Sequence, residues 1–123
     1  MIQLYKRMQR MREKYVDTLA KLYDYATTVY SKKQYTQWYD TKEGGYTYGS
    51  FKAKCDSLSK KLTQYGIGAG DKVAILMMNC IDWLPIYFGI LKSGAIAVPM
   101  NFRFSADEIE YCSDLADVSI LVF

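Results

Sequence analysis

The sequence predicts an α/β fold: a partial parallel βαβαβ sheet layer flanked by helices, with an N-terminal helix and a short β-hairpin. Three predominantly apolar segments, 72–78, 95–99 and 118–123, have the length of strands. Segments with helical spacing of apolar residues lie between them, and glycines mark several junctions. This alternation is typical of parallel strands joined by helical crossovers.

The segment 66–103 contains the central part of this pattern. Its apolar run 72–78 predicts a strand that is buried on both faces. Asn79 is a favourable N-cap residue, so we expect a helix to begin there and to end at Gly94. Residues 95–99 then predict the second strand of a parallel crossover.

The N-terminal residues 1–30 predict an amphipathic helix, because apolar residues recur three and four positions apart. Within 1–23, six basic residues stand against two acidic ones on the other face. Two interpretations remain open. The segment is either a surface helix packed on the domain, or a basic helix that makes peripheral contact with a membrane through 1–23.

Two further elements precede the central strand. Residues 34–40 alternate in the manner of a strand, and we expect them to pair with 46–48 as a hairpin or as two short edge strands. Thr47 then caps a helix that ends at Gly66, where the chain adopts a left-handed conformation.

The spacing of Gly66, Gly68 and Gly70 invites comparison with a dinucleotide-binding loop, and we reject that interpretation. A phosphate-binding glycine loop follows a strand and opens a helix, so that helix N–H groups point at the phosphate. Here the glycines are predicted to follow a helix and to open a strand. The strand-to-helix turn, 78–80, contains no glycine.

A second helix and a third strand complete the predicted layer. Ser105 is the expected N-cap residue, and Glu108 three positions later completes a capping box for a helix that runs to about Leu115. Residues 118–123 then predict the third strand.

The composition excludes several kinds of site. The chain has no histidine, which removes histidine acid–base chemistry, Ser-His triads and His-ligated metals. Its net charge of +3 is too small to indicate nucleic acid. The cysteines are odd in number and lack CxxC spacing, which favours free thiols in a reducing compartment; they are Cys55, Cys80 and Cys112.

The sequence also favours a cytoplasmic location, with peripheral membrane contact as the open alternative. The N-terminus alternates charged and apolar residues instead of showing the continuous apolar run of a secretory signal. The longest apolar stretch, 73–91, is interrupted at its middle by Asn79, Asp82 and Pro85, so it is a poor membrane span. The tyrosines are expected mainly as amphipathic rings at core margins.

Several ordered segments resemble one family. GAGDKVA at 68–74, GILKSGAIAVPMNFR at 89–103, YTY at 46–48 and SADEIEY at 105–111 are similar to the N-terminal part of the AMP-forming adenylating enzymes. That superfamily comprises acyl-CoA synthetases, luciferases and peptide-synthetase adenylation domains. Asn101-Phe-Arg103 resembles the Asn-x-Arg of the CoA ligases more than the Asp-Pro of peptide synthetases.

The resemblance implies a parent enzyme that uses ATP, CoA and Mg²⁺ to convert a carboxylic acid, fatty or other, to its acyl-CoA through an acyl-adenylate. It also implies one site residue: Arg103 would lie near a phosphate of CoA, although it could equally serve only to anchor its loop. Neither the resemblance nor the sequence assigns a catalytic or metal-ligating residue to this chain.

With 123 residues the chain is much shorter than members of that family, so residues 1–123 are expected to form a single, incomplete N-terminal α/β subdomain. The family's phosphate loop and catalytic lysine do not occur in it. We therefore expect these residues alone to bind no cofactor tightly, to lack synthetase activity, and to self-associate through an uncovered sheet edge. The alternative is a free-standing, non-enzymatic interaction or membrane-surface module.

Overall fold

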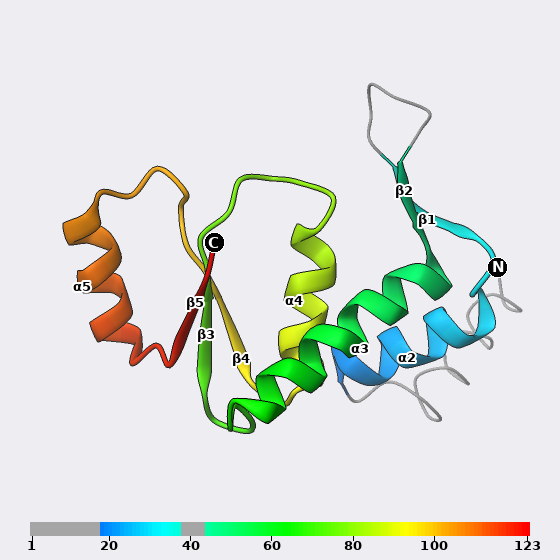
Figure 1. Cartoon of the computed structure of the whole chain (residues 1–123), viewed down its shortest axis with the longest axis horizontal. Coiled ribbons are helices and arrows are strands. Elements are labelled where there is room, and N and C mark those ends of the chain that lie inside the picture. Colours follow the sequence, from blue (N-terminus) through cyan, green and yellow to red (C-terminus); the bar gives the residue numbers. More distant parts are fainter. Residues whose placement is uncertain (1–17, 38–43) are drawn as a thin grey trace, which may run out of the picture.

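The computed structural model describes residues 18–37 and 44–123 (Figure 1). The described residues contain two sheets. An antiparallel pair is formed by β1 (Gln34–Gln37) and β2 (Gly45–Thr47), and a parallel sheet has the strand order β4-β3-β5. Its strands are β3 (Lys72–Ile75), β4 (Ile96–Pro99) and β5 (Ile120–Val122). The predicted α/β class, the parallel layer and the hairpin are therefore confirmed.

The central strand is β3, and the side chains of Val73, Ala74 and Ile75 are fully buried, as the apolar run predicted. The strand is shorter than the predicted 72–78, because pairing on both sides ends early. On one side, Ile75 lies opposite Pro99, the last residue of β4, and on the other β5 ends one residue before the terminus. A strand without neighbours on both sides loses the ladder that defines it.

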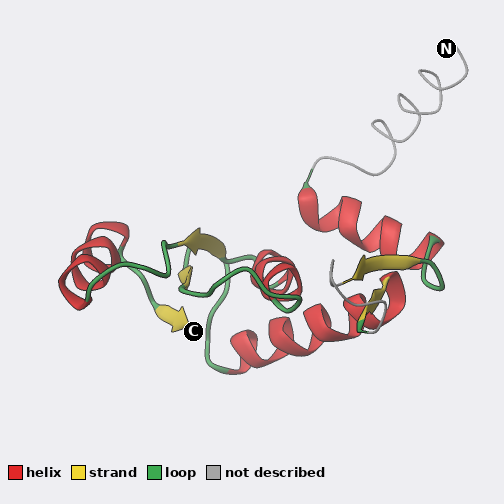
Figure 2. Ribbon diagram, turned by 90° about the horizontal axis from the view of Figure 1, so that it is seen from above, coloured by secondary structure: helices red, strands yellow, loops and turns green. Residues whose placement is uncertain are grey.

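The described part of the chain also contains four helices: α2 (Leu19–Val29), α3 (Tyr48–Gln64), α4 (Trp83–Lys92) and α5 (Ala106–Ala116). The parallel sheet lies between α4 and α5 (Figures 1 and 2). The long helix α3 packs against α4 and also against α2. As a result, α2 and the hairpin lie at the end of the molecule remote from α5 (Figure 1).

The predicted start of the helix after β3 was wrong. Asn79 does not cap it; α4 begins at Trp83, and Asp82 occupies the N-cap position without a side-chain capping bond. Pro85 explains the difference. Proline has no backbone N–H, and the first turn of a helix tolerates this because amides there have no acceptor within the helix. A helix that began at Asn79 would place Pro85 in its interior, where the proline would remove a hydrogen bond and clash with the preceding turn.

The helix ends predicted at Thr47, Gly66 and Ser105 are confirmed. The Thr47 side chain accepts a hydrogen bond from the Ser50 amide, and Gly66 has a φ of 81° in the left-handed region. Ser105 and Glu108 form the complete capping box at the start of α5. These features depend on neighbours three residues apart, which is why the sequence predicts them well.

The N-terminal prediction is tested only in part. Within the expected helix 1–30, α2 occupies Leu19–Val29, and the side chain of its N-cap residue Thr18 accepts a hydrogen bond from the Lys21 amide. Residues 1–17, which carry most of the predicted basic face, lie outside the described residues. The same holds for residues 38–40 of the predicted strand 34–40.

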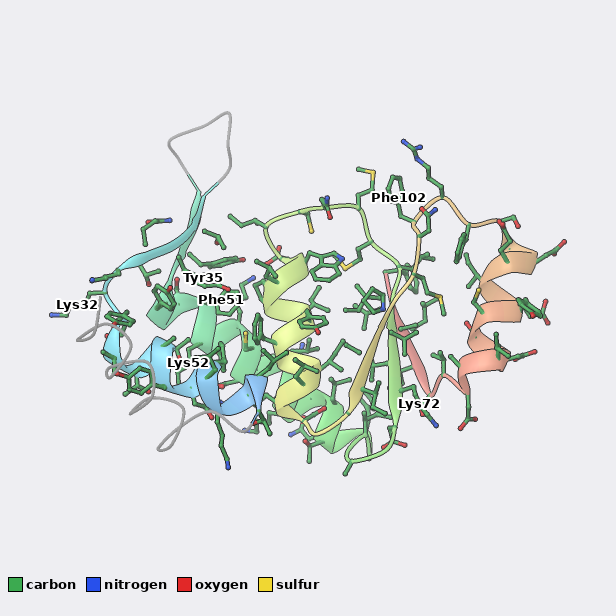
Figure 3. The ribbon with its side chains drawn as sticks, turned by 180° about the vertical axis from the view of Figure 1, so that it is seen from behind. Lys32, Tyr35, Phe51, Lys52, Lys72 and Phe102 are labelled. Carbon is green, nitrogen blue, oxygen red and sulfur yellow. The ribbon has the colours of Figure 1, made fainter. Side chains whose placement is uncertain are left out.

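The buried side chains form two clusters. One lies between the sheet and the helices α3 and α4, and consists of Leu62, Ile67, Val73, Ile75, Ile90 and Ala95. The other is centred on Tyr23, Phe51 and Cys55 and joins α2, α3 and the hairpin. Tyr35 approaches Phe51 with ring centroids 4.3 Å apart (Figure 3). Tyrosines thus serve here as packing groups, as the composition suggested.

Candidate functional site

The carboxyl edge of the parallel sheet is a candidate ligand-binding region. Ligands of open α/β sheets commonly bind outside the carboxyl ends of the strands. The loops that follow β3 and β4 lie at one edge, together with the end of β5 (Figure 1). The predicted site residue Arg103 lies in the loop that follows β4.

Local hydrogen bonds hold the backbone of this loop. The Met100 amide donates to Ile75 O at 2.9 Å, which extends the pairing of β4 with β3 by one residue. The Asn101 side-chain oxygen accepts from the Arg103 amide at 3.1 Å, and Asn101 O accepts from the Phe104 amide at 3.0 Å. Asn101 therefore forms the turn in this loop.

The Arg103 side chain is exposed and lies against its neighbour. Its guanidinium carbon is 5.4 Å from the centroid of the Phe102 ring, which stands in the loop that follows β4 (Figure 3). Among the described residues, no carboxylate forms an ion pair with this guanidinium. A permanently charged, uncompensated group with paired donors is chemically suited to a phosphate.

A second concave feature lies between α3 and the start of α4. It is an open groove of about 430 Å³, and its lining combines apolar and charged side chains: Lys54, Ser57, Leu58, Lys61, Met77, Asp82, Pro85 and Ile86. Within it, Asp82 accepts a hydrogen bond from the Tyr46 hydroxyl and lies 3.5 Å from the Lys54 ammonium. Sequence reasoning missed this groove because its walls come from three separate segments.

An ionic cluster joins α2, α3 and α4. Lys92 at the end of α4 contacts both Asp24 of α2 and Asp56 of α3, and Lys52 lies 3.0 Å from Asp56 and 3.5 Å from Asp24. Partial burial opposes ionisation of Asp56, but hydrogen bonds from Lys92 and Lys52 outweigh it and lower its pKa. Lys52 is visible between the helices in Figure 3. Only the Lys52–Asp56 spacing of four residues could have been read from the sequence.

Gly66, Gly68 and Gly70 lie between a helix and a strand, as the sequence predicted, and not in a phosphate-binding position before a helix. Gly66 follows α3, and Gly70, with a φ of 94°, precedes β3. The Gly68 amide donates to the Asp71 carboxylate at 2.7 Å, so an amide that could face an anion is already used internally. The geometry behind that rejection is therefore confirmed.

The described residues contain free thiols but no group of side chains arranged as a metal site. Cys55, Cys80 and Cys112 are all free thiols, and burial raises the pKa of Cys55. In residues 18–37 and 44–123, no three histidine, cysteine or acidic side chains are grouped as metal ligands. Over the same residues, no helix combines the length and the apolar character needed to cross a bilayer.

Comparison with protein families now decides the relationship. Residues 25–123 match the family model described as AMP-binding enzyme. The chain belongs to this family. The resemblance that the motifs indicated is confirmed, and so is its placement of this chain among the N-terminal regions of adenylate-forming enzymes.

Relatives within the AMP-binding enzymes include two mycobacterial ligases. A medium/long-chain-fatty-acid–CoA/3-oxocholest-4-en-26-oate–CoA ligase of Mycobacterium marinum is 37% identical over 76 residues, which are 62% of this chain and 14% of that protein. The long-chain-fatty-acid–CoA ligase FadD13 of Mycobacterium tuberculosis is 32% identical over 77 residues, 63% of this chain and 15% of the ligase. The chain thus spans about one seventh of the length of these relatives.

Solved structures of AMP-binding enzymes show the same fold. The N-terminal domain of FACL13 from Mycobacterium tuberculosis superposes with a TM-score of 0.78 at 27% identity, and the match covers 86% of this chain and 26% of that chain. The described elements are therefore those of an N-terminal subdomain of this family.

Proposed function

We propose that this chain forms the first α/β subdomain of an AMP-forming carboxylate–CoA ligase. The observation that carries the proposal is the family match over 25–123, together with the CoA-ligase names of the relatives. The parent reaction would join a carboxylic acid to the α-phosphate of ATP, with release of pyrophosphate. The CoA thiol would then displace AMP to give the acyl-CoA. Mg²⁺ would screen the phosphates so that the carboxylate can approach them.

The experiment uses the reading frame extended past Phe123 and purified as one protein. Pyrophosphate release is measured with ATP, Mg²⁺ and a panel of carboxylic acids, with and without CoA. Release that depends on one class of acid, with thioester formed only when CoA is present, supports the proposal and identifies the substrate. A parent protein that releases no pyrophosphate with any acid supports the alternative of a non-enzymatic module.

Arg103 is proposed to bind a phosphate of CoA. Its support is the exposed guanidinium, which lies on a backbone held by Asn101 and has no carboxylate partner among the described residues. Replacing Arg103 by Gln in the parent enzyme should raise the KM for CoA about tenfold, because a charge-assisted hydrogen bond is lost. Acid-dependent pyrophosphate release without CoA should be unchanged. An unchanged KM would leave Arg103 as a loop residue.

The 123 residues alone are proposed to lack synthetase activity and to bind no cofactor tightly, since the family's phosphate loop and lysine do not occur in them. Carboxylate-dependent pyrophosphate release by the purified chain would contradict this. A cytoplasmic location is proposed as well, supported by the three free thiols.

Self-association of the purified chain is proposed to occur at β5. Both β4 and β5 are edge strands, but Pro99 removes a backbone donor from β4, while β5 contains neither proline nor charge. Sedimentation velocity should show concentration-dependent association, and a monomer at every concentration would refute it. The proposed membrane contact through 1–23 falls mostly outside the described residues.

A further inference from the structure

The outward side of α2 carries an apolar stripe that no described residue covers. Leu19 and Val29 are 52% and 53% exposed, and Leu22 between them is also exposed. These positions recur at helical spacing on one side of α2, while Tyr23 and Thr27 on the adjoining side are buried against the domain. The helix is thus held by one face and leaves an adjoining apolar face in solvent.

The charges around this stripe are basic. Lys32 and Lys33 follow α2, and Lys32 points away from the domain (Figure 3). Asp24 is the one acidic residue between positions 18 and 33, and it is engaged by Lys52 and Lys92 in the ionic cluster. Within residues 18–33, the surface next to the stripe therefore presents positive charge, and its one carboxylate is engaged in the ionic cluster.

An aromatic side chain adjoins these lysines. Tyr30 is partly exposed at the end of α2, and the Lys33 ammonium lies 4.8 Å from its ring centroid. A ring with one apolar and one polar end, beside lysines, suits the boundary between lipid headgroups and acyl chains.

The exposed face of α5 provides an internal contrast. Tyr111 and Leu115 are 66% and 74% exposed, so α5 also presents apolar surface. Its charged residues, however, are all acidic: Asp107, Glu108, Glu110 and Asp114. Apolar exposure is thus common to both helices, and of these two only α2 has lysines near its exposed apolar residues.

We propose that α2 is a peripheral binding surface for anionic phospholipid, with the helix lying in the membrane plane and the stripe Leu19–Leu22–Val29 entering the headgroup region. Lys32 and Lys33 contact the lipid phosphates. This inference goes beyond the ligase activity and does not depend on it. A second copy of the chain is the competing occupant of the stripe, and a less favoured one because the stripe's basic surroundings are repeated on that copy.

The test is vesicle co-sedimentation of the purified chain. The vesicles contain phosphatidylcholine with about 30% phosphatidylglycerol, in about 100 mM NaCl so that charges are only partly screened. We expect binding to these vesicles and little binding to pure phosphatidylcholine. Replacing both Leu19 and Val29 by Gln should reduce the partition coefficient at least about tenfold, because two side chains lose their burial in lipid.

The charge is tested by replacing Lys32 and Lys33 by Gln, which should reduce partitioning about fivefold for each lysine. The matched control is Leu115→Gln on acidic α5, which should leave partitioning unchanged. All the replaced side chains are exposed, and circular dichroism verifies that each variant keeps its helix content.

Two results would overturn the proposal. One is the absence of binding to phosphatidylglycerol vesicles. The other is undiminished binding by the Leu19→Gln, Val29→Gln double variant, which would place any lipid contact outside α2. If that variant instead dissociates an oligomer in sedimentation velocity and binds vesicles as before, the stripe is an interface between copies.

Discussion

Gly89 of α4 lies directly against Leu58 of α3. A Cβ atom built on Gly89 would stand 3.0 Å from both Cβ and Cδ2 of Leu58, and 3.1 Å from the carbonyl oxygen of Cys55. Both Gly89 and Cys55 are buried, so the two helix backbones meet here without an intervening side chain. This close approach sets the spacing of α3 and α4, on which the sheet core and the aromatic cluster both depend.

Replacing Gly89 by Ala should therefore destabilise the fold. Alanine favours a helix interior by about 1 kcal/mol over glycine, but overpacking costs about 1–3 kcal/mol, and a backbone carbonyl cannot move aside easily. We expect a net loss of up to about 2 kcal/mol in the free energy of unfolding, measured in urea. Gly68→Ala is the control, because a Cβ there meets only Ser93 O at 4.0 Å. Equal stability of both variants would contradict the prediction.

Replacing Asp56 by Asn should weaken the ionic cluster between the helices. At neutral pH we expect a loss of about 1–2 kcal/mol, a modest value because both Asp56 and Lys92 are partly exposed to screening water. The folded-state pKa of Asp56 is lowered, so its contribution is present above the unfolded pKa of about 4 and is lost as the pH falls below it.

The measurement is urea unfolding of Asp56→Asn and of the parent chain between about pH 3 and about pH 7. The difference between them should shrink toward the acid end. Glu110→Gln on the exposed surface of α5 serves as the control and should change stability by less than about 0.5 kcal/mol at every pH. A difference for Asp56→Asn that does not depend on pH would show that its charge is not responsible.

Replacing Tyr23 by Phe should stabilise the chain. The Tyr23 hydroxyl is buried and has no hydrogen-bond partner among the described residues, although the Cys55 thiol lies nearby. Removing an unpaired buried hydroxyl should yield about 0.5–1 kcal/mol by thermal or urea unfolding. A clear loss of stability at neutral pH would reveal a bond that the structure lacks.

Alkaline unfolding tests the same hydroxyl independently. Burial raises the pKa of Tyr23, so its neutral form contributes stability that is complete below the unfolded pKa of about 10 and is lost as the pH rises further. Phenylalanine cannot ionise. The advantage of Tyr23→Phe over the parent chain should therefore grow above about pH 10, and a constant advantage would refute this part of the prediction.

Replacing Ser105 by Ala should loosen α5. This helix has no fully buried residue, so its capping box with Glu108 is a large part of what holds it. We expect a loss of about 1 kcal/mol, seen as reduced helix content by circular dichroism or lower stability in urea. Ser113→Ala makes the same replacement inside α5 and should be neutral or stabilising, because alanine is the better helix former. Equal losses at both positions would exclude the capping explanation.

Much of the fold could be predicted because its signals are local. The capping box at Ser105, the capping bond of Thr47 and the left-handed Gly66 each depend on residues within three positions. The buried strand β3 was recognisable from its uninterrupted apolar run. The start of α4 was missed because Asn79 has the capping chemistry, whereas Pro85 six residues later decides where an uninterrupted helix can begin.

The features of the candidate site also fall into two groups, those formed by near neighbours in the sequence and those formed by distant residues. Asn101 and Arg103 could be identified as a turn and an exposed cation because their relationship spans two residues. The groove around Asp82 and the ionic cluster around Lys92 could not, since their members lie tens of positions apart in the chain. No periodic pattern in the sequence predicts contacts between residues so far apart in the chain.

The sequence by itself determined the family, the order of strands and helices, and the helix ends at Thr47, Gly66 and Ser105, because each rests on ordered motifs or on contacts between near neighbours. Only the tertiary structure decided that β3 lies between β4 and β5, that Gly89 sits on Leu58, and that α2 exposes its stripe. The physical reason is that packing joins residues by distance in space, and the side of a helix that stays in water is known only when its neighbours are in place.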